Sequence, residues 1–543
     1  MAAIASHLQI SDAAIAYVST SDYSSASFPA AEVKHDTPHK SPINPQVCNS
    51  EPNPAAEIVT WDGPDDPQDP FNWPAWKKWW TVGLGLVASF VCSMNGSILA
   101  VAHDAISEEF GISDGSFPHS SDGSFPHSYW ITTSWGVGAA LFPLLLFPAM
   151  EDWGVRPVVL GTYFCFICLL VPIGFARNFM TLIVVRLFSG GCVPLMSDAV
   201  ASIASNVFQG DKARSVPIAL YVLVYLGATS LGPVVGAAIF QCFNSWRWIG
   251  HIELIMTGAL FPLFCVGLPE TRSGAILRAK AKKIRHEGEK VAWTAVRQLL
   301  IRSLTRPLYM FFTEGVVFVA AMWAAFSLGT IYLFTHSVNQ VYGDLYGWTP
   351  VQAGYVQSAI VVGEVLGTAL SISTTSHWYA ASAARNNEVP GTPIPEARLY
   401  AAILGGSIGV TGGMFIYAWA AYTTVHWLVI TLGLTLVGLG TTAVVISIAN
   451  YLVDAYSKYA ASALAAVGLA ENLSIAFLPL ASSALYTGLG FQWASTLLGL
   501  VSLVLVATPF VVIRWGREIR ARSPFMKEAI IDRRRDFGVR VDV

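Results

Sequence analysis

Charged residues and cysteines are both scarce in this chain of 543 residues. Only 12% of the residues are charged, whereas 54% are apolar and the mean hydropathy is +0.52. The seven cysteines are scattered and suggest no disulfide framework. Cys165 and Cys168 have the spacing of a CxxC pair, but they lie in an apolar run without further ligands, so we interpret them as packing residues. We therefore expect no metal site and no nucleic-acid partner.

Motifs for nucleotide binding and for hydrolysis are also missing. The sequence contains no Gly-Lys dipeptide, and hence no GxxxxGK[ST] loop to hold a nucleotide phosphate. It also lacks HExxH, GxSxG and any Cys/His cluster in a water-accessible segment. A membrane enzyme would need a polar constellation near an interface, which the sequence does not display. We therefore expect no enzyme, no catalytic residue and no cofactor, with a proton gradient as the energy source.

Long apolar runs, about twelve in number, are what the chain has in abundance. Each has roughly 18 to 26 residues, enough for a helix to cross a hydrocarbon core of about 30 Å. The runs are continuously apolar rather than alternating, which argues against a membrane β-barrel. The predicted spans are residues 79–101, 130–150, 158–175, 179–204, 218–240, 248–268, 309–334, 353–373, 399–422, 427–450, 460–480 and 493–513.

The positive charges are confined to alternate gaps between these runs. Of the 32 Lys and Arg residues, 29 lie in the two tails and in every second gap, whereas the other gaps hold only Arg177 and Arg247. Basic residues stay on the cytoplasmic side of a membrane protein, so we expect both termini and the middle loop in the cytosol. The plasma membrane is the expected location, with a vacuolar or vesicular membrane as the alternative.

The runs fall into two sets of six, as two tandem half-transporters would give. We predict a disordered cytosolic tail at 1–76, a six-helix bundle at 77–268, a basic cytosolic linker at 269–306, a second six-helix bundle at 307–514 and a cytosolic tail at 515–543. The linker is either an amphipathic helix lying on anionic headgroups or a solvated loop that only fixes topology. The start of the chain lacks the basic and apolar regions of a signal peptide, so we expect none.

Ionisable residues well inside the predicted spans are our candidates for proton coupling. A charge at the bilayer centre costs about 2.5–3.5 kcal/mol on insertion scales, so such residues usually face a cavity or a partner. Burial and a nearby arginine shift a carboxyl pKa in opposite directions, so an acid between the two can load and release a proton. The alternative is a structural ion pair or an interhelical hydrogen bond. The candidates are Arg186, Asp198, Glu253, Glu364 and Glu471.

Glycine and proline in the fifth and eighth spans indicate close helix contacts. Small residues four apart let helices approach closely, and a Gly-Pro pair within a span supplies a kink. In a transporter this pattern suits the moving contact between two halves, although static packing explains the spacing equally well. The residues are Gly227, Gly232, Pro233, Gly236, Gly363 and Gly367.

Polar and aromatic residues inside the spans are candidates for lining a substrate cavity. The sequons at Asn95 and Asn472 lie within spans, out of reach of glycosylation, so we interpret both asparagines as cavity-lining or interhelical hydrogen-bonding residues. Four aromatic residues could line a cavity for bulky ligands, although interfacial or lipid-facing positions are the commoner place for such residues. They are Trp135, Tyr225, Trp323 and Tyr332.

The first external loop contains an unchanged tandem repeat. The sequence SDGSFPHS occupies residues 113–120 and again 121–128. His119 and His127 could in principle sense pH or bind a metal, but loop lengthening without function is the better interpretation, because external loops tolerate insertion.

A series of short motifs runs through the chain in a fixed order. They are WDGPDDP at 61–67, RLFSGG at 186–191, the segment from Gly227 through GPVVG at 232–236, WRW at 246–248, PET at 269–271, PEARL at 395–399, NYLVD at 450–454 and SAL at 462–464. Each is weak alone, but together they resemble the fungal major facilitator superfamily transporters of the twelve-span drug:proton antiporter group. The resemblance implies an all-α membrane fold of about twelve transmembrane helices in two six-helix bundles, with Arg186 linked to proton coupling.

The loop after the second span departs from the family pattern. Where the family usually carries GxxxDRxGRR, this chain has PAMEDWGVR at 148–156. Glu151 can replace the aspartate and Arg156 remains, but the other basic positions are occupied by Asp152 and Val155. We therefore expect the cytosolic charge latch between helices to be weaker or rearranged.

The predicted function is proton-coupled efflux of small amphipathic organic compounds, such as a drug, a toxin or a secondary metabolite, by alternating access. One alternative is a proton-coupled or facilitative importer of a nutrient on the same fold. Another is a non-transporting membrane sensor. The expected partners are a small-molecule substrate, protons and the lipid bilayer, and we expect a monomer.

Overall fold

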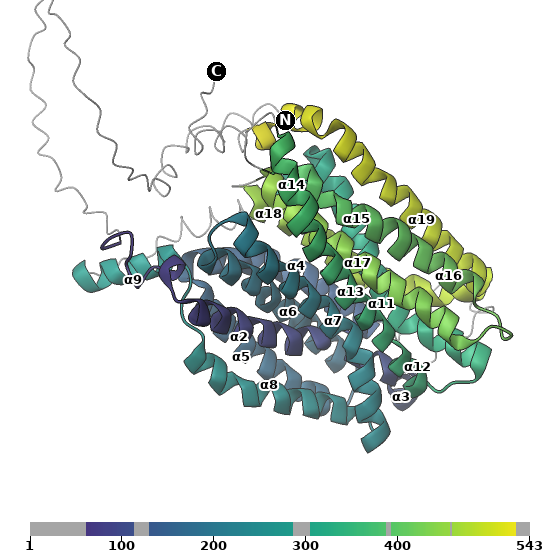
Figure 1. Cartoon of the computed structure of the whole chain (residues 1–543). Coiled ribbons are helices and arrows are strands. Elements are labelled where there is room, and N and C mark those ends of the chain that lie inside the picture. Colours follow the sequence, from purple (N-terminus) through teal and green to yellow (C-terminus); the bar gives the residue numbers. More distant parts are fainter. Residues whose placement is uncertain (1–60, 113–129, 286–303, 387–392, 457–458, 528–543) are drawn as a thin grey trace, which may run out of the picture. The chain divides into compact units, whose positions relative to one another are not determined.

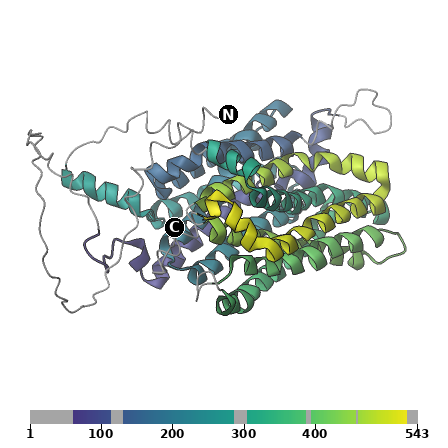
Figure 2. The same ribbon diagram turned by 90° about the horizontal axis from the view of Figure 1, so that it is seen from above.

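The computed structural model describes residues 61–112, 130–285, 304–386, 393–456 and 459–527. Twelve segments of this described part are helices long and apolar enough to span a membrane. The long helices run side by side in both ribbon views (Figures 1 and 2). The prediction of an all-α fold with about twelve spans is therefore confirmed. Residues 1–60 and 528–543 of the predicted tails and the tandem repeat lie outside the described residues.

The first six spans form what we call the N-terminal bundle. Helices suit these apolar runs because each helix satisfies its own backbone hydrogen bonds, which lipid cannot do. The elements are α2 (Ala75–Met94), η3 (Ile98–Ala102), α3 (His103–Glu109), α4 (Trp130–Trp153), α5 (Val155–Gly174), α6 (Phe179–Val207), α7 (Asp211–Phe243) and α8 (Arg247–Gly267). The short η2 (Pro70–Asn72) precedes this bundle and α9 (Ser273–Arg285) follows it.

The last six spans form what we call the C-terminal bundle. Its elements are α11 (Gly315–Tyr346), α12 (Pro350–Val356), α13 (Ser358–Thr374), η5 (Thr375–Tyr379), α14 (Ala380–Ser382), η6 (Ala383–Arg385), η7 (Pro395–Leu399), α15 (Tyr400–Leu404), η8 (Gly405–Gly412), α16 (Gly413–Trp419), α17 (Trp427–Tyr456), α18 (Ala460–Phe477) and α19 (Leu480–Arg522). The ninth span is therefore interrupted, since η8 is a π-helical segment between α15 and α16.

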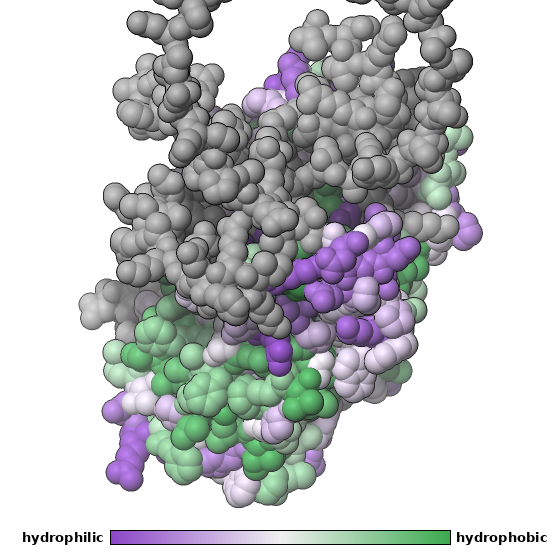
Figure 3. Space-filling model, turned by 90° about the vertical axis from the view of Figure 1, so that its left-hand side faces the viewer, coloured by the Kyte–Doolittle hydropathy of each residue, from purple (hydrophilic) through white to green (hydrophobic). Residues whose placement is uncertain are grey.

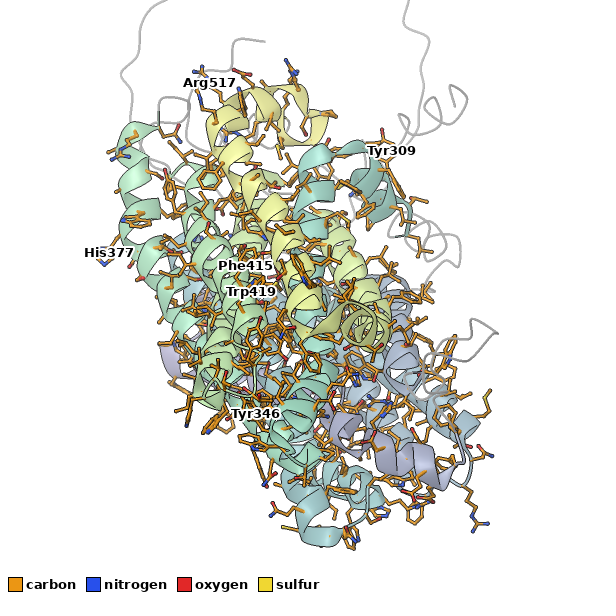
Figure 4. The ribbon with its side chains drawn as sticks, turned by 90° about the vertical axis from the view of Figure 1, so that its right-hand side faces the viewer. Tyr309, Tyr346, His377, Phe415, Trp419 and Arg517 are labelled. Carbon is orange, nitrogen blue, oxygen red and sulfur yellow. The ribbon has the colours of Figure 1, made fainter. Side chains whose placement is uncertain are left out.

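The two ends of the helices differ in what they carry. We call the end where α2 begins and α19 ends the terminal face, and the opposite end, where α3 and α12 lie, the distal face (Figure 1). Figure 4 shows Tyr309 and Arg517 near one end of the C-terminal bundle and Tyr346 near the other. At the distal face the rings of Tyr342, Tyr346 and Trp348 pack together, as expected for an interfacial aromatic belt.

The outer surface of the described part is strongly apolar. Figure 3 shows a broad hydrophobic face next to a smaller hydrophilic area. Large side chains such as Ile255, Val266 and Val504 are mostly exposed, although a water-soluble protein would bury many residues of this type. Such a surface is suited to contact with lipid tails.

The first span corrects one detail of the predicted boundaries. We predicted a continuous run over 79–101, whereas α2 ends at Met94 and the chain resumes helical structure only at Ile98. The interruption coincides with the Asn-Gly pair at 95–96, a dipeptide that favours turns. Beyond it, η3 and α3 extend this span to Glu109.

Candidate functional site

The break after α2 is a buried polar point of the N-terminal bundle. The last carbonyl groups of a helix have no partner within that helix. The carbonyl oxygens of Asn95 and Gly96 therefore need other donors. Both meet the guanidinium of Arg186, which α6 carries past the break. A discontinuous transmembrane helix is a common place for a binding site.

Arg186, Asn95 and Glu253 form one hydrogen-bonded network across three helices. Arg186 Nη1 donates to the Asn95 backbone oxygen at 2.6 Å and to Asn95 Oδ1 at 2.8 Å, and Nη2 donates to the Gly96 oxygen at 3.0 Å. Asn95 Nδ2 donates to Glu253 Oε2 at 3.0 Å. All three residues are buried. The side-chain amide of Asn95 therefore links the guanidinium of Arg186 to the carboxyl group of Glu253.

Two polar atoms of this network lack a hydrogen-bond partner among the described residues. Within the described part of the chain, Arg186 Nε and Glu253 Oε1 are buried and have no hydrogen-bond partner. An unpaired buried polar atom is costly, so such atoms in a native structure call for an explanation. A proton or a polar substrate group that binds here only during part of a cycle would supply one.

Aromatic rings cover the network on the side of the C-terminal bundle. Trp135 Nε1 donates to Asn95 Oδ1 at 3.0 Å, and the Trp135 ring stacks against Tyr332 of α11 with centroids 6.0 Å apart. Gly96 makes this approach possible, because a Cβ there would lie 2.5 Å from Tyr332 Oη and 2.9 Å from the Trp135 ring. The network therefore lies directly beneath a contact between the two bundles.

A second buried carboxyl lies at the contact between α7 and α13. Ser230 Oγ donates to Glu364 Oε1 at 2.6 Å, and this bond joins the two bundles. Glu364 is fully buried, and its Oε2 has no hydrogen-bond partner among the described residues. A Cβ at Gly227 would lie 3.6 Å from that oxygen, which is ordinary van der Waals contact. No arginine or lysine accompanies Glu364 in the hydrogen bonds that the structure describes.

The remaining two predicted acids lie together but away from Arg186. Tyr221 Oη donates to Asp198 Oδ1 at 2.5 Å, and the carboxyl groups of Asp198 and Glu471 are near enough to interact electrostatically. Tyr225 stacks on Tyr221 with ring centroids 6.4 Å apart. Asp198 and Glu471 are half-buried, unlike Glu253 and Glu364.

Comparison with known proteins places these features in a family. The sequence profile of the Major Facilitator Superfamily matches residues 85–381. The MFS transporter cpaT of Aspergillus oryzae is 33% identical over 484 residues, which cover 87% of this chain and 93% of that protein. The chain belongs to the major facilitator superfamily. The efflux pump atB of Aspergillus terreus is 32% identical over 402 residues, which cover 71% of this chain and 82% of that protein.

Solved structures of the superfamily share the fold at low sequence identity. The human organic anion transporter MFSD10 (TETRAN) aligns with a TM-score of 0.55 and 14% identity, over 80% of this chain and 100% of that chain. The proton:xylose symporter XylE aligns with a TM-score of 0.57 and 13% identity, over 80% and 95%. At such identities the likeness supports the fold alone.

At the terminal face, this superfamily member has a buried ion pair within the C-terminal bundle that we did not predict from the sequence. Arg398 Nε donates to Asp454 Oδ2 at 2.9 Å, and Tyr379 Oη donates to the same oxygen at 2.7 Å. Arg398 Nη1 also donates to Ser215 Oγ at 3.2 Å, which links the C-terminal bundle to α7. The PEARL and NYLVD motifs carried the only signal for this pair, because they contribute its arginine and its aspartate.

The degenerate loop after α4 contacts a glutamate from the PET motif. Glu270 accepts hydrogen bonds from the backbone N–H groups of Val155 and Arg156 at 3.1 and 3.0 Å, so it caps α5. Arg156 Nη2 donates to the Cys265 oxygen at 2.9 Å, near the end of α8. Gly154, with φ of +98°, fits because a Cβ there would meet the Glu270 carboxylate. The side chain of Glu151 lies outside the described part.

The WDGPDDP motif folds into a tight segment in front of α2. Asp66 accepts hydrogen bonds from the backbone N–H groups of Asp62 and Gln68, and these hold the pKa of its carboxyl below the ordinary value. Lys280 of α9 donates to Asp62 Oδ1 at 2.6 Å and lies 3.9 Å from Asp66. This contact bears on the two interpretations of the linker: Lys280, at least, is paired with protein carboxylates.

The predicted glycines lie mainly in contacts within one bundle. A Cβ at Gly363 or Gly367 would meet the backbone of α17, and a Cβ at Gly232 or Gly236 would meet the chain around Ile98. These contacts fit the packing alternative. Two positions of α7 lie at contacts between the bundles. Gly227 is beside Glu364, and the backbone oxygen of Pro233 is beside Gly354. The helix α7 continues through Pro233 without a break in its residue range.

Two of the predicted cavity residues lie elsewhere than we expected. Trp323 is buried in the core of the C-terminal bundle, where Gly406 of η8 makes room for its indole ring. Packing therefore explains Trp323 better than a cavity does. Asn472 Nδ2 donates to the Gly468 oxygen of its own helix rather than to another helix. Asn95, Trp135 and Tyr332 meet at the network described above, and Tyr225 lies beside Tyr221.

Proposed function

We propose that this protein exports small amphipathic organic compounds, with inward proton movement as the driving force. The efflux pump atB and the efflux pump radE of Floropilus chiversii are similar over most of their lengths, which supports the direction. Proton coupling requires a buried acid whose partners change during the cycle. The network of Arg186, Asn95 and Glu253 is the observation that carries this part of the proposal.

The energetics of the proposed coupling are sufficient. A charge that crosses a potential of 100 mV releases about 2.3 kcal/mol, which supports roughly a fifty-fold concentration gradient for each proton. Glu253 would bind the proton through its free Oε1, and Arg186 would favour release of that proton because it stabilises the carboxylate. The cycle then needs no cofactor besides the proton gradient.

The position of the network suits alternating access. It lies beneath the Trp135–Tyr332 contact between bundles, so separation of the bundles at that contact would uncover it. We place both termini in the cytosol and the protein in the plasma membrane, as a monomer. In that orientation the distal face is outside the cell, and its opening would let protons reach Glu253.

The decisive experiment measures accumulation of a fluorescent lipophilic cation in yeast that lacks its own drug pumps. Cells with the wild-type chain should hold less dye than cells with an empty vector, and a protonophore should abolish the difference. Arg186→Ala should abolish it as well. Arg177→Ala is a matched control, because Arg177 is exposed on the connection before α6, outside the network.

Two results would contradict the proposal. Higher accumulation with the wild-type chain would indicate uptake, the importer alternative. Lower accumulation that persists with the protonophore or in Arg186→Ala would mean that export does not depend on protons through this network. If no dye is moved, the same comparison is repeated with labelled fungal metabolites, and failure across that panel would favour the sensor alternative.

A further inference from the structure

Two histidines face each other across the distal contact between the bundles. His103 begins α3 in the N-terminal bundle, and His336 lies on α11 in the C-terminal bundle. Their rings are edge to face, with centroids 6.0 Å apart. His103 Nδ1 also lies 3.1 Å from Asp104 Oδ1. None of these three residues belongs to the network of the proposed function.

Each histidine is fixed to its own bundle. Glu109, at the end of α3, accepts hydrogen bonds from Arg247 at 2.6 and 2.8 Å and from Trp246 Nε1 at 2.6 Å, so α3 is held on α8. On the other side, the oxygen of Thr335, next to His336, accepts a hydrogen bond from Gln357 Nε2 at 3.3 Å. The two rings must therefore separate whenever the bundles part at the distal face.

The surroundings of the pair are apolar and closed. All five residues of η3, immediately before His103, are buried, and a Cβ at Gly354 of α12 would touch Val101 at 3.1 Å. Figure 1 shows α3 and α12 together at this end. The side chain of His103 is 20% exposed and His336 is buried, whereas the side chain of Asp104 is 82% exposed. Water thus reaches the pair from the side of Asp104.

Few other charges lie on the elements packed around the pair. Within the described residues, η3 and α12 carry no charged side chain, and the distal half of α7 offers only the thiol of Cys242. The charged or titratable groups are Asp104, Glu108 and Glu109 on α3, Asp344 on α11, and Arg247, His251 and Glu253 on α8, where Glu253 is bound to Asn95. Glu109 and Arg247 neutralise each other. Asp104 is therefore the carboxylate that acts most directly on the two rings.

We propose that His103 and His336, with Asp104, form a proton-binding site that opens the distal face when it is loaded. This proposal rests on the proposed function, since it names where protons from the distal side first act. Asp104 Oδ1 lies 3.1 Å from His103 Nδ1, so a protonated His103 forms an ion pair with it. A second proton on His336 would place two cations in a closed apolar contact, and separation of the bundles relieves the repulsion and hydrates both rings. Acid therefore favours the open distal face through linkage.

The test measures opening directly, without reference to transport. Ala102 is almost fully buried beside His103, so Ala102→Cys reports when this contact opens. The exposed Cys242 is replaced by serine, and a membrane-impermeant thiosulfonate is applied to cells at external pH 7.5 and 5.5. We expect the labelling rate to rise roughly tenfold at the lower pH, which corresponds to a change of about 1.4 kcal/mol in the free energy of opening.

Substitutions decide whether the pair is responsible. His336→Gln and His103→Gln should each flatten the rise, and Asp104→Asn should weaken it, because the His103 ring loses the carboxylate that lies 3.1 Å from its Nδ1. His426→Gln is the control, since His426 is an exposed histidine outside the pair. An unchanged rise in both His103→Gln and His336→Gln, with normal protein levels, overturns the proposal.

The labelling assay tests the proton-binding site and the dye assay tests the proposed function, so the failure of one proposal can be distinguished from the failure of the other. If the wild-type chain exports dye in a proton-dependent way but labelling ignores both histidines, the site proposed here is wrong and the proposed function stands. If labelling follows pH through the pair but no compound is exported, the proton-binding site stands and the proposed function is wrong. A flat wild-type labelling rate between pH 7.5 and 5.5 also counts against the site.

Discussion

Glu253 and Glu364 are both buried acids, but they differ in their location and in their hydrogen-bond partners. Glu253 lies within one bundle and shares an amide with an arginine, so its charge has a compensating cation nearby. Glu364 lies between bundles and is held by one serine hydroxyl. A cation close to a buried carboxylate makes the charged form accessible, whereas an isolated one favours the protonated form. The comparison suggests that Glu253 exchanges protons and that Glu364 serves the contact.

Arg186→Gln should have the largest effect on this comparison. The substitution removes the cation and the Arg186 hydrogen bonds to the backbone oxygens of Asn95 and Gly96, and breaking a buried charged network costs about 3–5 kcal/mol. We expect both export and thermal stability in detergent to fall sharply. Arg177→Gln should change neither. A stable Arg186→Gln protein with normal export would show that the network is dispensable.

Glu253→Gln and Glu364→Gln separate the two acids directly. A glutamine in place of Glu253 can keep the hydrogen bond from Asn95 but cannot carry a charge, so the export gradient should fall from as much as roughly fifty-fold to near one. A glutamine in place of Glu364 can still accept from Ser230, so the gradient should change by less than about fivefold, the equivalent of one hydrogen bond of about 1 kcal/mol. Dye gradients in energised vesicles measure both. The opposite ranking would reverse the roles given to the two acids.

Gly96→Ala tests how closely the C-terminal bundle covers the Glu253 network. The new Cβ would lie 2.5 Å from Tyr332 Oη, and overpacking of this kind costs about 1–3 kcal/mol. We expect a lower melting temperature and weaker export. Gly83→Ala in α2 is the matched control, because no atom lies within 4 Å of its Cβ, and it should be neutral or slightly stabilising. Equal effects of the two changes would mean that the close approach at Gly96 does not hold in the membrane.

Ser230→Ala should have the smallest effect of these five substitutions. It removes a single hydrogen bond from Glu364, which is worth about 1.5–3 kcal/mol if the carboxyl is charged and about 0.5–1.5 kcal/mol if it is neutral. We expect the lower range, since Glu364 has no cation in its described hydrogen bonds. Thermal unfolding in detergent measures the loss. Ser358→Ala, at an exposed position of α13, is the control.

The sequence predicted about twelve spans, because hydropathy is a local property, and it singled out Asn95, Trp135 and the acids inside the spans as candidates, whose roles stay predictions. It could not predict which residues meet, since rotation of each helix about its axis decides that. Arg186 and Asp198 are candidates on the same helix, but twelve residues along α6 separate them by about 18 Å, and Arg186 binds Asn95. The same limit hid the Ser230–Glu364 bond and the meeting of His103 with His336.

The Asn-Gly signal at 95–96 shows how more could have been predicted. A turn dipeptide inside an apolar run predicts a break, and a break leaves backbone carbonyls that need donors. The arginine inside another run was the obvious donor. We interpreted the Asn-Gly dipeptide and Arg186 each as a feature of its own helix, so we did not predict the hydrogen bonds between them.

The bond between Arg186 and the end of α2 also orders events during synthesis. Arg186 follows Asn95 by 91 residues, so the first helix is already in the membrane when the fourth leaves the translocation channel. Until Arg186 reaches those carbonyl groups, its guanidinium is a cation in lipid without a partner, at a cost of about 2.5–3.5 kcal/mol. The open end of α2 thus acts as a docking point for a later helix. Changes at 95–97 should first appear as retention of newly made protein by cellular quality control, before any defect in transport can be measured.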